Sequence, residues 1–163
     1  MILDLKEFFK KNEMHQRFEI NFDAKELEID DWFMIGRITG HLDLYYSDDN
    51  LFGDLNYTYA YTEPCARCNE MVEVSQTTDV TLSIDNESEE DLYVSLVDDK
   101  INLIPVIIDG IYLSKPMRAL CSEECKGICP ECGSNKNIKP CECEGQKIDP
   151  RLKDLMNLLD KEV

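Results

Sequence analysis

Cysteines are the residues of this chain best suited to chemistry: there are eight, and they occur in closely spaced pairs. One pair lies in "EPCARCNE", and the other three lie in "LCSEECKGICPECGSNKNIKPCECEGQ", residues 120–146. Structural zinc is bound tetrahedrally by four cysteine or histidine ligands. The cysteines therefore fit two such sites, and the candidate metal ligands are Cys65, Cys68, Cys121, Cys125, Cys129, Cys132, Cys141 and Cys143.

Both C-x2-C motifs contain the residues that a metal-binding turn requires. Such a turn presents two thiolates and directs backbone N–H groups at the sulfur atoms. In "CPECG", Pro130 fixes the turn, and Gly133 permits a left-handed conformation after the second cysteine. In "CARCN", Asn69 takes the place of the glycine, and asparagine also tolerates that conformation. We expect the two motifs to form turns of the same kind.

Chain order suggests how the cysteines divide between two sites. Cys129 and Cys132 can join Cys141 and Cys143 across the short loop 133–140, which makes a local site. The remaining four would then form a site that links segments far apart in sequence. Other pairings stay open, because the terminal C-x-C is tight for one ion and its members could serve different sites. We expect one or two Zn²⁺ per chain, with two favoured.

Other roles for the cysteines are disulfides, a thiol redox switch, an iron–sulfur cluster and a catalytic zinc. Disulfides are rare in a reducing cytosol. Neither C-x2-C motif lies in a legible strand–helix unit with an adjacent base, and the spacings differ from those of ferredoxins. Catalytic zinc usually has a histidine or carboxylate ligand. The two histidines, His15 and His41, are distant in sequence and are expected on the surface or in strands.

Negative charge dominates the N-terminal part of the chain. The formal net charge is −17, and residues 1–116 contain 9 Lys/Arg against 25 Asp/Glu. Two zinc sites with four thiolates each would bring the total to about −21. Nucleic-acid binding depends on cations that meet phosphates, so direct contact with ribosomal RNA or another nucleic acid is disfavoured. The charge either suits a basic protein partner or serves only solubility.

The elements that must position the cysteines are mainly strands. "RFEINFD", residues 17–23, alternates apolar and polar residues as a half-buried strand does. Residues 32–46 and 51–62 are rich in β-branched and aromatic residues and flank the turn "SDDN", which predicts a hairpin. "CARCNEMVEVSQTTDVTLSI" predicts a turn followed by one long strand or a strand pair.

Two helices are expected after these strands. Residues 102–113 form an apolar helix in which Pro105 occupies the first turn, although Gly110 is unfavourable within it. Asp149 can cap a final helix that begins at Pro150, with an apolar stripe that docks on the protein's own core or on a partner. The predicted fold is α+β: a mostly antiparallel, barrel-like β body with one packed helix (1–116), a cysteine-rich zinc module (117–148) and an amphipathic terminal helix (149–163).

The sequence contains no recognisable signal peptide, membrane span or catalytic motif. Residues 1–18 carry early charges and no uninterrupted apolar stretch, and no run approaches the roughly 20 apolar residues of a membrane span. We therefore expect a cytoplasmic protein without a membrane partner. There is no phosphate-binding glycine loop, nucleophile motif or distinctive carboxylate pair. We expect neither an enzyme nor a small-molecule substrate.

Several of these motifs together resemble a known family. "CKGICPECG", the C-x-C pair, "CARCNEMVEV" and "DPRL" are similar to motifs of the YceD-like proteins, and the resemblance covers roughly residues 30–160. Ile128 and Lys136 stand where the family favours leucine, and Gly110 is unusual in its helix. Members of this family are bacterial and plastid proteins associated with accumulation of the large-subunit ribosomal RNA.

The resemblance implies a non-enzymatic role in ribosome biogenesis, in accumulation of large-subunit (23S) ribosomal RNA. It also implies that the eight cysteines bind metal, most securely Cys129, Cys132, Cys141 and Cys143. The expected partner is a basic ribosomal protein or assembly factor of the large subunit. The alternative function is a redox-responsive zinc/thiol regulatory protein, which would lose its metal and form disulfides on oxidation.

Overall fold

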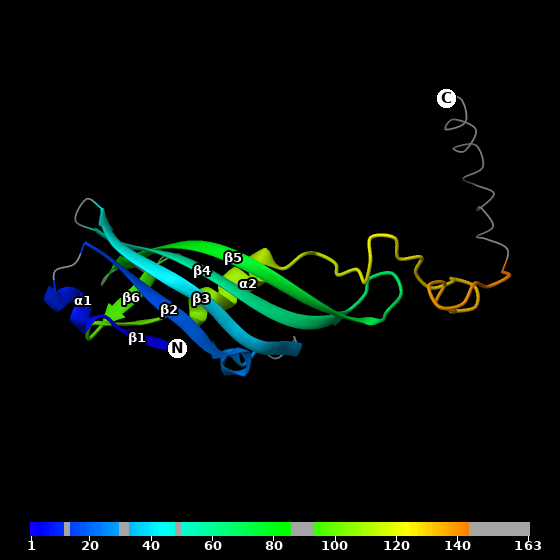
Figure 1. The fold of residues 1–163 in the computed structure, drawn as a ribbon, viewed down its shortest axis with the longest axis horizontal. Coiled ribbons are helices and arrows are strands. Elements are labelled where there is room, and N and C mark those ends of the chain that lie inside the picture. The colour runs from blue at the N-terminus through cyan, green and yellow to red at the C-terminus, as the bar shows by residue number, and fades with distance from the viewer. Residues whose placement is uncertain (12–13, 30–32, 48–49, 86–92, 144–163) are drawn as a thin grey trace, which may run out of the picture. The chain divides into compact units, whose positions relative to one another are not determined.

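The protein is described by a computed structural model that covers residues 1–11, 14–29, 33–47, 50–85 and 93–143 (Figure 1). These residues belong to two compact units. Unit 1 comprises Met1–Glu63 and Met71–Ala119, and unit 2 comprises Pro64–Glu70 and the chain from Leu120 onward. The loop Pro64–Glu70 thus groups with the cysteine-rich segment, although the chain order places it within the predicted β body. The predicted terminal helix, 149–163, lies outside the described residues.

Unit 1 is built on one seven-stranded sheet in the order β1-β7-β6-β5-β4-β3-β2, which curls into a half-barrel (Figure 1). The pairs β1–β7, β7–β6, β4–β3 and β3–β2 are antiparallel, whereas β5 and β6 are parallel. Two short helices and one longer helix complete the described elements. In chain order they are β1 (Ile2–Asp4), α1 (Lys6–Lys11), β2 (His15–Asp23), the 3-10 helix η1 (Ala24–Leu27), β3 (Phe33–Ser47), β4 (Asn50–Pro64), β5 (Met71–Asp85), β6 (Tyr93–Val97), β7 (Lys100–Asn102) and α2 (Ile104–Ser114).

The hydrophobic core lies on one face of this sheet. Along β4, every second residue from Leu51 to Tyr61 is buried, because alternate side chains of a strand point to opposite faces. Tyr57, Tyr59 and Tyr61 are at most 1% exposed; the rings of Tyr59 and Tyr61 stack, and the ring of Tyr57 is tilted against that of Tyr59. Isoleucine, leucine and phenylalanine side chains from the neighbouring strands complete the same cluster. This core gives unit 1 an apolar interior of its own.

Helix α2 packs against the tyrosines of β4. The Tyr57 hydroxyl donates to the Ile107 carbonyl oxygen at 2.9 Å, and the Tyr59 hydroxyl lies 2.9 Å from Ser114 Oγ. Gly110 is buried in this contact, and a Cβ at that position would collide with the Tyr57 hydroxyl. The glycine that weakened the helix prediction is therefore what allows α2 to approach β4 closely.

The predicted β character is confirmed, with the expected long strands at β2, β3 and β4. The segment after "CARC" forms one long strand, β5, and the apolar helix occupies Ile104–Ser114 with its proline in the first turn. Several features were not predicted: the N-terminal β1 and α1, the 3-10 helix η1, the short strand β7, and the parallel pairing of β5 with β6. Pairing between strands is a tertiary property that a strand's own alternation of residues does not encode.

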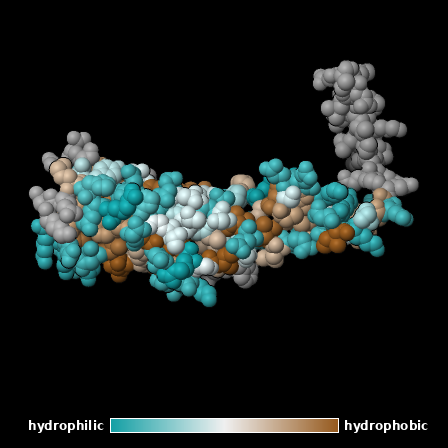
Figure 2. Space-filling view, viewed as in Figure 1, coloured by the Kyte–Doolittle hydropathy of each residue, from teal (hydrophilic) through white to brown (hydrophobic). Residues whose placement is uncertain are grey.

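The face of the sheet away from the core is polar. Side-chain hydrogen bonds cross from β4 to β5 between Asp54 and Thr81, Asn56 and Asp79, and Thr58 and Thr77. Figure 2 shows hydrophilic and intermediate residues over much of the visible surface of unit 1, with hydrophobic residues between them. Among the helices of the described residues, none is long and apolar enough to cross a membrane.

Candidate metal centre

The two C-x2-C motifs of unit 2 fold into turns with the same hydrogen bonds. In the first, Cys65 N–H donates to the Glu70 carbonyl at 2.8 Å, and Asn69 N–H donates to the Cys65 carbonyl at 2.9 Å. In the second, Cys129 N–H bonds Ser134 O and Gly133 N–H bonds Cys129 O, both at 2.8 Å.

The residue after each second cysteine has the left-handed conformation that the sequence predicts. Its φ is +62° at Asn69 and +72° at Gly133. Glycine meets no steric penalty there, and asparagine tolerates the conformation better than most residues. The two motifs are therefore one structural device that occurs twice.

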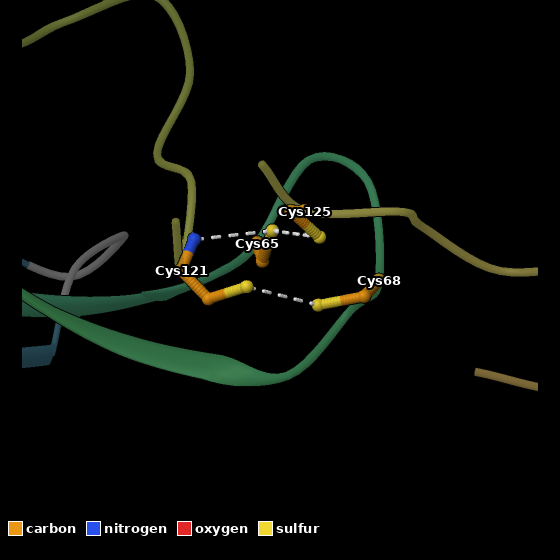
Figure 3. A group of neighbouring side chains, drawn as sticks. All are labelled: Cys65, Cys68, Cys121 and Cys125. Atoms are coloured by element: carbon orange, nitrogen blue, oxygen red, sulfur yellow. Dashed lines mark hydrogen bonds between the residues drawn. The ribbon is translucent and has the colours of Figure 1, made fainter. Parts of the chain in front are cut away.

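The first cysteine group, called quartet A, consists of Cys65, Cys68, Cys121 and Cys125 (Figure 3). Its members come from the loop between β4 and β5 and from the segment after Leu120, and their side chains point toward one another. The Sγ atoms of Cys68 and Cys121 are 3.5 Å apart, and those of Cys65 and Cys125 are 3.9 Å apart. Quartet A thus joins segments separated by more than 50 residues of sequence.

The second cysteine group, called quartet B, consists of Cys129, Cys132, Cys141 and Cys143. All four come from one short segment, and the loop 133–140 closes the site. In each quartet the four Sγ atoms lie within 4.8 Å of one another. The structure therefore brings together all eight predicted site residues, in the grouping that chain order favours.

The sulfur positions fit a tetrahedral metal ion better than disulfides. Four sulfurs at about 2.3 Å from a zinc ion are separated by about 3.8 Å from one another. The sulfur–sulfur separations of 3.5 and 3.9 Å in quartet A lie on either side of that value. A disulfide requires about 2.05 Å, and all eight cysteines are free thiols. Each quartet could hold one metal ion, and four cysteine ligands are a set that zinc commonly takes.

Burial in unit 2 is almost confined to sulfur. In its described part, 64–70 and 120–143, the buried residues are four cysteines and one glycine: Cys65, Cys68, Cys125, Gly127 and Cys129. The larger apolar side chains Ile128 and Ile138 are 47% and 75% exposed. A small unit whose described residues form no apolar interior needs cross-links or a metal for its stability.

Local groups lower the pKa of two thiols in each quartet: Cys65 and Cys125 in quartet A, and Cys129 and Cys132 in quartet B. Backbone N–H groups of Arg67, Cys121 and Cys68 lower the pKa of Cys65 to about 6. Hydrogen bonds from the Ser134 side chain and backbone, with the neighbouring cysteines, lower the pKa of Cys132 to about 6. Such donors stabilise a thiolate, which is the form of cysteine that binds metal.

The same quartets also contain thiols that resist ionisation. Hydrogen bonds with Cys125 and Cys68 raise the pKa of Cys121 to about 12. Contact with Cys132 does the same for Cys143, whose pKa is also raised to about 12. Several thiolates in one place repel one another. A cation at the centre removes that repulsion, so metal binding must displace protons from these thiols.

Sequence reasoning missed the polar groups that surround quartet A. Asn137 Nδ2 donates to Cys125 Sγ at 3.2 Å, and Arg67 Nη1 donates to the carbonyl oxygens of Glu123 and Cys125. Asparagine is common in any turn, so "SNKN" carries no signal that would identify a metal-site residue. His15 and His41, by contrast, lie in β2 and β3, each 3.7 Å from the Asp43 carboxylate, as strand residues of unit 1.

Comparison with known proteins supports the family resemblance. The family model described as "Large ribosomal RNA subunit accumulation protein YceD" matches residues 53–159. An uncharacterized protein of Mycobacterium tuberculosis is 36% identical over 78 residues, which are 48% of this chain and 37% of that protein. An uncharacterized protein of Mycobacterium leprae is 33% identical over 76 residues, 47% of this chain and 35% of that protein.

A plant relative carries a functional name. The large ribosomal RNA subunit accumulation protein YCED homolog 1, chloroplastic, of Arabidopsis thaliana is 32% identical over 62 residues, 38% of this chain and 19% of that protein. The aligned part spans 37% or less of the length of these curated relatives. No solved structure matches the chain significantly. Because the family model covers more than half of the sequence and includes both quartets, the chain belongs to the YceD family.

Proposed function

We propose that this protein is a non-enzymatic, zinc-binding factor in ribosome biogenesis that promotes accumulation of large-subunit (23S) ribosomal RNA in the cytoplasm. The observation that carries the ribosomal part is membership of the YceD family over residues 53–159. The name of the plant relative agrees with it. The chemistry of unit 2 supports the zinc part, and the charge of unit 1 supports the choice of partner.

The case for zinc rests on what holds unit 2 together. In its described part the buried side chains are four cysteines, and all eight cysteines converge in two groups of four. The sulfur separations in quartet A suit a tetrahedral ion. Zinc is inert to oxidation and reduction and prefers such ligands in structural sites. With all four positions of each site taken by cysteine, no position remains for a substrate. This coordination favours a structural role and agrees with the expectation that the protein is not an enzyme.

A groove on the polar face of unit 1 is where we place the basic partner. It has a volume of about 380 Å³, and its lining includes Asp43, Asp54 and Asp79. Asp43 is paired with Arg17, but Asp54 and Asp79 accept hydrogen bonds from the neutral side chains of Thr81 and Asn56. Their charges favour a lysine- or arginine-rich segment of a large-subunit protein or assembly factor and disfavour direct RNA contact.

Metal content and thiol protection test the zinc proposal. Reduced protein purified without chelators should contain two zinc ions per chain, and all eight thiols should resist alkylation until a chelator is added. The redox-regulator alternative predicts alkylation of exposed thiols such as Cys121, Cys132 and Cys143 in the metal-loaded protein. If the purified protein contains no metal and the amides of unit 2 are still protected from hydrogen exchange, the zinc proposal is contradicted.

Co-sedimentation tests the ribosomal proposal. The protein should migrate with large-subunit precursors on a gradient at low salt, and the association should weaken as salt screens the charges. The double variant Asp54→Asn/Asp79→Asn should weaken the association about 2- to 30-fold. It removes two exposed charge pairs with the partner, and each such pair typically contributes about 0.2–1 kcal/mol. The control Glu123→Gln/Glu131→Gln makes the same charge change in unit 2. Protein that stays free of precursors at low salt would contradict the proposal.

A further inference from the structure

A loop that belongs to quartet B provides a hydrogen bond to quartet A. The loop 133–140 connects Cys132 with Cys141. Within it, the Asn137 side chain donates from Nδ2 to Cys125 Sγ at 3.2 Å and accepts at Oδ1 from the Lys126 N–H at 2.8 Å. One amide group therefore both donates to a ligand sulfur of quartet A and fixes the backbone beside that ligand.

Asn135 holds Asn137 in place and reaches the first C-x2-C turn. Its Oδ1 accepts from the backbone N–H and from Nδ2 of Asn137, both at 2.9 Å. Its own Nδ2 donates to Glu70 Oε1 at 3.2 Å, and Glu70 closes the turn that presents Cys65 and Cys68. Two asparagines of the quartet B loop thus contact both segments that build quartet A.

Backbone hydrogen bonds set the position of this loop. Ile128 and Asn135 form an isolated antiparallel bridge, and the Lys136 N–H donates to the Gly127 carbonyl at 2.9 Å. The Ile128 N–H donates in turn to Arg67 O at 3.0 Å, within the first C-x2-C turn. Gly127 has a φ of +71°, and a Cβ there would lie 3.0 Å from Arg67 O, so this close approach requires glycine.

We propose that Asn137 is a positioning residue for the metal site of quartet A, and that quartets A and B bind metal with positive coupling through the loop 133–140. The inference rests on the proposed function only in taking both quartets as zinc sites. Metal in quartet B closes the loop 133–140 between Cys132 and Cys141. The ordered loop then presents Asn137 to Cys125.

Two physical effects produce the coupling. An N–H donor to a ligand sulfur stabilises the thiolate and orients it, and loss of such outer contacts typically costs about 10- to 100-fold in metal affinity. An ordered loop also removes part of the entropy that quartet A would otherwise lose on binding. Coupling between two binding sites is reciprocal, so metal in quartet A strengthens quartet B by the same factor.

The test measures zinc affinity site by site in the reduced full chain. Zinc is titrated against a competing chelator, free thiols are alkylated, and mass spectrometry reads protection of each cysteine. Asn137→Ala should lower the zinc affinity of quartet A about 10- to 100-fold. Cys141→Ser/Cys143→Ser, which disables quartet B, should weaken quartet A by a similar factor. The three substitutions together should weaken it by much less than the product of the two factors, because both act through one loop.

Controls separate this proposal from a general loss of structure. Ile138→Ala alters an exposed neighbour in the same loop and should leave quartet A within about twofold of the unsubstituted chain. Asn137→Asp keeps an oxygen that accepts from the Lys126 N–H but loses the N–H donor to Cys125. It should therefore weaken zinc binding at quartet A, and it tests the proposal even if Asn137→Ala disturbs folding.

Two outcomes would overturn the inference, and they are distinguishable. If quartet A keeps its zinc affinity without quartet B or without Asn137, the inference fails, while the proposed zinc function stands. If the unsubstituted chain protects neither quartet in the presence of zinc, the zinc function and the inference fail together.

Discussion

Unit 1 buries leucine, isoleucine and tyrosine side chains between a seven-stranded sheet and α2, whereas the described part of unit 2 buries cysteines and a glycine. Apolar burial stabilises a fold in proportion to the area removed from water, without directional bonds. Sulfur atoms grouped in fours stabilise a fold only when a cation joins them. The two units should therefore respond differently to the same treatments, and four experiments measure this difference.

Removal of the metal should produce the largest effect, and only in unit 2. Structural zinc contributes about 10 kcal/mol or more to the folding of small domains. Hydrogen–deuterium exchange after chelation should show loss of protection at the amides of Ile128, Gly133 and Lys136, while the amides of β4 stay protected. Returning zinc should restore the lost protection. If both units lose protection together, unit 1 is not stabilised independently of the metal, and the prediction is wrong.

Acid should affect unit 2 at a higher pH than unit 1. Cys65 and Cys132, with a lowered pKa of about 6, gain protons as the pH falls through 6, so metal affinity falls more steeply below that value. In unit 1, the Arg17 guanidinium lowers the pKa of Asp43, so the stability from this pair is present above pH 3.8 and is lost only below it.

Zinc release and sheet unfolding, followed during one acid titration, measure the difference between the units. Release should precede the loss of far-ultraviolet β signal. Simultaneous transitions, or unfolding of the sheet first, would contradict the prediction.

Gly110→Ala should destabilise unit 1 and leave metal binding unchanged. The added methyl group meets the Tyr57 hydroxyl, and it lies 3.1 Å from Val80 Cγ2. Overpacking costs about 1–3 kcal/mol, which exceeds the helix propensity gain of about 1 kcal/mol. Thermal unfolding should show a lowered midpoint of the sheet transition with two zinc ions retained. The matched control is Asp109→Ala, the exposed neighbour in the same helix.

Tyr57→Phe should have the smallest effect. It removes the hydrogen bond to the Ile107 carbonyl oxygen and should cost about 0.5–1.5 kcal/mol. It also removes the atom that meets a methyl group at position 110, so Gly110→Ala should be less harmful in this background. Denaturant unfolding of the four proteins of this cycle measures the coupling. Strict additivity would show that the hydroxyl is not the obstacle.

Local sequence determined several of these features. The two C-x2-C turns follow from Pro130, Gly133 and Asn69, because residues that adopt a left-handed conformation after the second cysteine are few. The alternation in β4 follows from the two-residue period of a strand. The division into quartets was favoured by chain order but not decided by it, since the C-x-C pair could have served either site.

Other features depend on contacts between distant residues. The sequence gives no reason for a glycine at position 110 of a helix. The structure does, because a side chain there would collide with the Tyr57 hydroxyl. Asn135 and Asn137 contact Glu70 and Cys125 because the fold places the loop 133–140 beside quartet A. The parallel pairing of β5 with β6 carries no signature in either strand.

The sequence by itself determined the chemistry of this protein: eight thiols at zinc-ligand spacing, an acidic strand-rich body, and the motifs of the YceD family. These properties depend on residue type and on short separations along the chain. Only the tertiary structure decided which sulfurs meet, that the described part of unit 2 buries cysteines where unit 1 buries hydrocarbon, and that Asn137 of the loop 133–140 contacts Cys125. Those properties depend on side chains that fold together from distant positions, and no local pattern records them.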